Sequence, residues 1–135
     1  MTTSHAPITC LDDLIATWRD VLSNAPLRGR NLWLMFLDTS GAPHPALTQI
    51  EGLSLAADDV AVANLADIVR RLLDDDAHLA GAALCLERGG TLGASPFEEA
   101  WADALTRELG AHLAWPVLAR TPGGIAPVRL RTRAA

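Results

Sequence analysis

The chain has 135 residues, half of them hydrophobic and a fifth charged, which indicates a single domain with an ordinary buried core. Its 16 acidic residues outnumber the 11 basic ones, and the net charge of -5 argues against a general nucleic-acid binder. The sequence contains no lysine and no tyrosine, which excludes Schiff-base chemistry, a P-loop lysine and a tyrosine general acid.

Several familiar segments are missing from the sequence. No apolar run approaches the roughly 20 residues that a membrane-spanning helix needs. The N-terminal residues MTTSHAPIT lack the basic and apolar regions of a signal peptide. Cys10 and Cys85 are far apart and form no CxxC motif, which rules out a metal knuckle or redox motif. We therefore expect a cytoplasmic protein that binds neither membrane nor nucleic acid.

The first half of the chain predicts a helix and a hairpin. Apolar residues recur at helical spacing over residues 11–22, which predicts an amphipathic helix. The continuous apolar run over 32–37 predicts a strand covered on both faces, and residues 42–50 predict a returning strand. Because proline cannot donate a ladder hydrogen bond, Pro43 and Pro45 predict that the beginning of that second strand lies at a sheet edge or is irregular.

The second half alternates helices and strands. The predicted elements are a helix capped by Asp58 or Asp59 with its buried face over 62–73, a strand over 80–86, a loop over 87–94, a helix with a capping box at Ser95–Glu98, and strands over 113–119 and 125–130. The order α-β-β-α-β-α-β-β predicts an α/β (α+β) fold, with a mixed β-sheet between helices in three layers. We divide the chain into a lead-in and helix (1–30), an α/β domain (31–130) and an arginine-containing tail (131–135).

This order of elements resembles a known family. The segments that carry the resemblance are LWLMFLDTSG, QIEG, VANLADIVRRLL, AGAALCL, SPFEEAWADALTRELG and LAWPVLARTPGGIAPV. Together they make residues 32–130 similar to the RadC-like branch of the JAB/MPN metalloprotease fold, which is of the cytidine-deaminase-like type. The resemblance implies that the strand over 80–86 leads into the loop that holds the family's metal.

The family's zinc ligands are not kept at the matching positions. An ungapped placement puts the two metal-binding histidines on Glu87 and Gly89, and the metal-binding aspartate on Ala100. The family's general-base glutamate lies in the early hairpin region, where Glu51 is the one carboxylate. The resemblance therefore implies a degenerate member without zinc or another cofactor.

The favoured function is a non-catalytic protein-binding or scaffolding domain whose old cleft is lined by Glu87, Arg88 and Thr91. A partner's extended segment could add to a sheet edge beside this cleft. One alternative is a hydrolase with a rearranged site, using Glu51 with Glu87 or the scattered histidines 44, 78 and 112. Another is a small-anion or nucleotide binder that uses the glycine-rich loop over 87–95.

Self-association is a further expectation. Four tryptophans are many for a chain of this length, and aromatic side chains often anchor interfaces. Trp33 and Trp101 lie on stripes that the pattern predicts to be buried. Trp18, on the N-terminal helix, is therefore the interface candidate for a homodimer.

Overall fold

The computed structural model describes residues 6–89 and 96–128. Within these ranges the chain forms three α-helices, a short 3-10 helix and five strands. Their bounds are α1 (Leu11–Val21), β1 (Arg30–Asp38), β2 (Pro43–Ile50), α2 (Asp59–Asp75), β3 (Leu79–Arg88), α3 (Pro96–Leu109), η1 (Gly110–His112), β4 (Leu118–Thr121) and β5 (Gly124–Pro127). None of the helices in these ranges is both long enough and apolar enough to cross a membrane.

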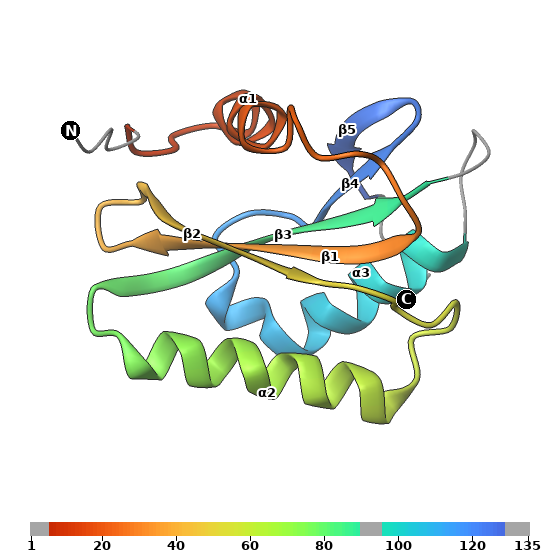
Figure 1. Cartoon of the computed structure of the whole chain (residues 1–135). Helices are drawn as coiled ribbons and strands as arrows, with labels where there is room; N and C mark the ends of the chain where they lie inside the picture. The colour runs from red at the N-terminus through yellow and green to blue at the C-terminus, as the bar shows by residue number, and fades with distance from the viewer. Residues whose placement is uncertain (1–5, 90–95, 129–135) are drawn as a thin grey trace, which may run out of the picture.

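The strands form one five-stranded sheet in the order β2-β1-β3-β4-β5. β3 and β4 run parallel, and the other three neighbouring pairs run antiparallel. Helix α1 lies over one face of the sheet, and α2 and α3 lie over the other (Figure 1). The prediction of an α+β fold with a mixed sheet flanked by helices is therefore confirmed.

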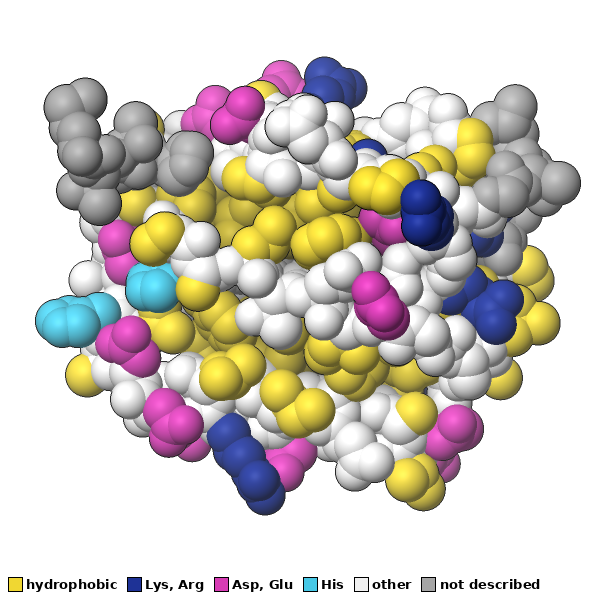
Figure 2. Space-filling view, in the orientation of Figure 1, with side chains coloured by type: hydrophobic (Ala, Val, Ile, Leu, Met, Phe, Trp, Pro, Cys, Tyr) yellow, Lys and Arg dark blue, Asp and Glu magenta, His cyan; other side chains and the backbone are white. Residues whose placement is uncertain are grey.

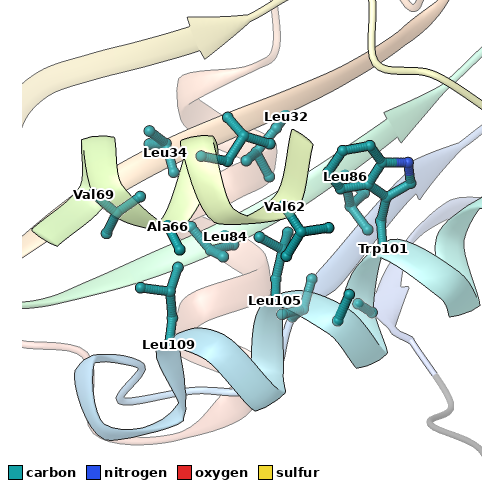
Figure 3. Close-up of a cluster of buried hydrophobic side chains, with 14 of the residues drawn as sticks. Leu32, Leu34, Val62, Ala66, Val69, Leu84, Leu86, Trp101, Leu105 and Leu109 are labelled. Carbon is teal, nitrogen blue, oxygen red and sulfur yellow. The ribbon is translucent and has the colours of Figure 1, made fainter. Parts of the chain in front are cut away.

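The larger core lies between the sheet and the helices α2 and α3 (Figure 3). Every second residue of β1, namely Leu32, Leu34 and Phe36, points into it, because successive side chains of a strand alternate between its faces. Trp101 of α3 is fully buried there, and its indole N–H donates a hydrogen bond to the carbonyl of Ser54 at 2.8 Å. This core fixes α2 and α3 on one side of the sheet.

A second core lies on the opposite face, under α1. Leu14 and Trp18 of α1 are fully buried against Met35, Leu37 and Cys85 of the two central strands. The amphipathic helix predicted from the sequence therefore packs on the sheet of its own chain. The N-cap residue of this helix is Cys10, whose side chain makes no capping hydrogen bond, and the preceding Thr9 donates its hydroxyl to Asp13 at 2.8 Å.

The bounds of β3 and β4 differ from the predictions in ways that have a physical reason. β3 continues to Arg88, beyond the predicted end at residue 86, because its ladder with β1 extends over two more residue pairs. β4 starts only at Leu118, whereas a strand was predicted from residue 113. Leu113 makes only an isolated bridge to Ala82, and Pro116 lacks the N–H that a longer ladder would use. The capping residue predicted at Ser95 lies outside the described ranges.

Candidate binding site

A cleft of about 520 Å³ opens where the loop before β1 meets the ends of β2 and β3. Glu51 and Glu87, both singled out from the sequence, line it together. Glu51 is exposed, whereas the side chain of Glu87 is fully buried. The exposed residues Arg28 and Arg30 belong to the same lining, so the mouth of the cleft carries charges of both signs.

The carboxylate of Glu87 accepts hydrogen bonds on both oxygens. Oε1 accepts from the indole N–H of Trp33 at 2.7 Å and from the guanidinium of Arg120 at 3.0 Å. Oε2 accepts from the side-chain amide of Asn31 at 3.0 Å and from the backbone N–H of Arg28 at 3.1 Å. A carboxylate offers about four acceptor positions, so these donors satisfy it. Glu87 therefore joins β1, β3, β4 and the loop before β1.

Arg120 connects this network to the end of α1. Its second guanidinium nitrogen donates to the carbonyls of Leu22 at 3.2 Å and Ala25 at 2.7 Å. The last carbonyls of a helix have no partner within the helix, and a cation is favourable beside them. One arginine on β4 thus stabilises the C-terminal end of α1 and neutralises Glu87.

Arg88 and Thr91 were predicted to line the cleft from a loop. The structure corrects the placement of Arg88, which belongs to β3 and lies opposite Arg30 of β1. Its side chain is buried and forms an ion pair with the equally buried Glu98 of α3. Arg88 therefore fastens α3 to the sheet, and Thr91 lies outside the described residues.

The interface role suggested for Trp18 is wrong. Its side chain is fully buried in the core under α1, so it presents no surface to another molecule. Its indole N–H has no acceptor among the described residues. The apolar stripe of an amphipathic helix predicts which residues are covered, but it does not tell whether the covering surface belongs to the same chain.

The other groups of catalytic type are dispersed. Burial raises the pKa of the Cys85 thiol from 9.0 to about 12, so it stays protonated at neutral pH and is a poor nucleophile. His44 lies in β2, His78 precedes β3 and His112 ends η1. Among the residues that the structure describes, no group of three or more His, Cys, Asp or Glu side chains is placed to hold a metal ion.

One edge of the sheet is open beside the cleft. In the described part of the chain, no strand pairs with the outer side of β2. The segment Pro43–Ile50 contains no charged residue, and Leu47 at its centre is 37% exposed. Figure 2 shows hydrophobic side chains on both sides of this strand, toward α1 and toward α2.

Hydrogen bonds at the start of β1 show which backbone groups face β2. The carbonyl of Arg30 accepts a hydrogen bond from the backbone N–H of Leu53, on the β2 side, at 2.8 Å. The carbonyl of Gly29 accepts one from the backbone N–H of Gly89, on the β3 side, at 2.9 Å. Because the direction alternates along a strand, the following even-numbered residues of β1 bond toward β2.

The same alternation identifies the free groups of β2. Leu34 of β1 lies opposite Thr48, so Thr48 bonds inward. Leu47 and Gln49 then direct their N–H and C=O groups away from the sheet. Their side chains share the α1 side of the sheet with Met35 and Trp33, the residues directly opposite them.

An exposed apolar flank of α2 lies beside the same edge. Arg70 of α2 donates to the carbonyl of Glu108 at 2.7 Å, so the flank that carries Arg70 faces α3. Ile68 and Leu72 are each two positions from Arg70, about 200° around the helix, and therefore lie on the flank away from α3. They are 45% and 37% exposed. We call Ile68 and Leu72 the outer flank of α2.

Asn31, Trp33 and Arg120 were not predicted as partners of Glu87. A signal was present, because each is a polar or partly polar residue within or next to a strongly apolar run. A polar or charged group in such a position must be hydrogen-bonded or paired when it is buried. The partner itself could not be named, because the residues lie 33 to 56 positions from Glu87.

Comparison of the chain with family models, with curated proteins and with solved structures found no match.

Proposed function

We propose that this chain is a non-catalytic protein-binding or scaffolding domain, related in architecture to the JAB/MPN fold but without its zinc site. The observation that carries the proposal is the uncharged outer edge of β2, which has an exposed Leu47 at its centre. An open edge of this kind accepts an extended segment of another chain by β-strand addition. Proteins that do not use such an edge usually protect it with charges, prolines or bulges, or cover it. In β2 the two prolines and the register shift fall before Leu47, so the stretch from Leu47 to Gln49 carries none of these devices.

The residues at the family's zinc positions support the absence of JAB-type hydrolysis. That chemistry needs three protein ligands and a fourth position open to water. Glu87 is engaged by protein donors, and Gly89 and Ala100 carry no ligand atoms in their side chains. We expect the purified protein to contain no zinc by elemental analysis. Stoichiometric, tightly bound zinc would contradict this part of the proposal.

The cleft supplies specificity next to the edge. Gln49 of β2 and the following Glu51 line the cleft, so a segment lying along β2 reaches it at the C-terminal end of the strand. The half-buried indole of Trp33 and the charged groups of Arg28 and Glu51 would then contact side chains of the added segment. Backbone pairing would provide affinity, and the cleft would select the sequence.

A capture experiment with edge variants tests the proposal. Gln49→Pro removes an outward N–H and should block strand addition, while leaving the bonds of β2 to β1 in place. Asp12→Ala, at an exposed position of α1 outside the cleft lining, is the control. The tagged protein and both variants are incubated with lysate of the native cell and with a differently tagged copy of the chain. Proteins retained by the parent and by Asp12→Ala, but lost with Gln49→Pro, are the expected result; identical retention by all three would contradict it.

A further inference from the structure

We propose that the segment added to β2 is β2 of a second copy of this chain, antiparallel to the first, about a two-fold axis that passes beside Thr48. The inference rests on the proposed function and names the partner. The resulting dimer would have one continuous sheet of twice the width, with both α1 helices on one face and the α2 and α3 helices on the other.

The backbone of β2 is complementary to itself in this register. Leu47 of one copy lies opposite Gln49 of the other, and both residues direct their N–H and C=O groups outward. The two symmetric pairs provide about four hydrogen bonds between the chains. Pro45, which has no N–H, falls opposite Glu51 just beyond the strand. A register centred on Leu47 would place Pro45 opposite Gln49 and lose a donor from each central pair.

The side chains of β2 allow a copy to approach. A two-fold axis brings each strand against its own sequence, so any charge in the paired segment faces a like charge nearby. The segment Pro43–Ile50 has no charged residue and avoids that repulsion. Across the axis Thr48 faces Thr48 of the other copy, and Ala46 faces Ile50. These are hydroxyl and apolar pairs that stabilise antiparallel strands.

The outer flank of α2 adds apolar surface to the same interface. An axis perpendicular to the sheet keeps both α2 helices on one face and runs them antiparallel. The flank with Ile68 and Leu72 lies away from α3, on the β2 side of each copy, and so faces its counterpart. Strand pairing alone buries little side-chain area, and the two flanks supply the hydrophobic contact that a stable dimer needs.

The first test is the mass in solution and a cysteine placed on the axis. We expect the parent protein to be a dimer by sedimentation or light scattering at about 100 µM. In a Cys10→Ser background, Thr48→Cys should form a disulfide between the copies under mild oxidation. Facing Cα atoms at such a pair are about 4.5 Å apart, within the range of a disulfide. Ala46→Cys is the control, since its copies would be more than about 10 Å apart along the strands.

The second test introduces charges at two positions that the proposed register places opposite one another. Leu47→Glu and Gln49→Lys, made singly, should each raise the dissociation constant of the dimer about tenfold or more. The double variant places each introduced carboxylate opposite an introduced ammonium of the other copy, and it should recover most of the affinity. Gln49→Pro should give a monomer. Should this variant fail to fold, the two charged variants, at exposed positions, still decide the question.

The outcomes separate this inference from the proposed function. A monomer at about 100 µM, a dimer that Thr48→Cys does not cross-link, or a dimer insensitive to the edge variants would overturn the second copy as partner. If other proteins are still captured by the parent and lost with Gln49→Pro, the edge binds a different chain and the proposed function stands. If neither the tagged copy nor any other protein depends on the edge, both proposals are wrong.

Discussion

Trp18 and Trp101 are buried on opposite faces of the same sheet, but their indole N–H groups differ. That of Trp101 donates to the carbonyl of Ser54 at 2.8 Å, whereas that of Trp18 has no acceptor within the described ranges. An unpaired buried donor destabilises the folded state, and a paired one does not. Two residues of the same type therefore differ in what their N–H contributes to stability.

Replacing each tryptophan by phenylalanine should show this difference. Both substitutions remove a similar volume from a fully buried site. Trp101→Phe also leaves the Ser54 carbonyl without its donor, so we expect it to cost about 1–2 kcal/mol more than Trp18→Phe. Urea unfolding of the two variants measures the difference. Equal losses would mean that Trp18 has an acceptor in solution.

The hydrogen bonds of Glu87 predict a large loss of stability when its charge is removed. In Glu87→Gln the introduced amide would point a donor at groups that already donate, and Arg120 would lose its buried counter-charge. We expect a loss of about 3–5 kcal/mol in the free energy of unfolding. Glu51→Gln, exposed in the same cleft, should change it by less than about 0.5 kcal/mol. A small effect at both positions would argue against a structural role for Glu87.

The end of β3 approaches the loop before β1 too closely for a side chain. A Cβ added at Gly89 would lie 3.1 Å from the backbone nitrogen of Gly29 and 3.3 Å from the carbonyl oxygen of Leu27. Gly89→Ala should therefore displace the loop that lines the cleft and cost about 1–3 kcal/mol. Gly110→Ala is the control, because no atom lies within 4 Å of its Cβ. Thermal unfolding of both variants checks the expectation, which a similar Tm for the two would refute.

The buried thiol of Cys85 should make the folded protein less stable at alkaline pH. Burial raises the pKa of its thiol from 9.0 to about 12, so the folded protein keeps a proton that the unfolded chain releases. The contribution of the protonated Cys85 thiol to the free energy of unfolding is fully present below pH 9. It is lost as the pH rises toward 12, by about 1 kcal/mol per pH unit. Denaturant unfolding between pH 8 and pH 10.5 should show a flatter profile for Cys85→Ala than for the parent. The exposed Cys10 is the control, and Cys10→Ala should leave the parent's slope unchanged.

Local patterns were sufficient to predict most of the helices and central strands. The 3.6-residue spacing of Val62, Leu65 and Val69 and the apolar run at the centre of β1 each reflect a single element against a core. The segment from Leu113 looked equally apolar, yet only its end joins the sheet. Apolar composition indicates burial, and it does not distinguish a strand from an irregular segment packed on the core.

The candidate site was less predictable. Glu87 was singled out, but it was placed in a loop because a glycine run follows it. Its position in the sheet depends on its pairing with Asn31, 56 residues away, and such pairing leaves no periodic signal in the sequence. The sequence predicted only part of what makes β2 a candidate binding edge. Its prolines indicated an edge, but which backbone groups of that edge are free follows from the register with β1.

The cap that Arg120 places on α1 has a consequence for the order in which the chain can fold. α1 has 11 residues, and an isolated helix of that length is marginal in water. The carbonyl of its C-cap residue, Leu22, accepts a hydrogen bond from Arg120 of β4, which lies 98 positions further along the chain. The helix should therefore gain this cap only after β4 has joined the sheet. Until then, the apolar face of the sheet that it covers must be protected in some other way.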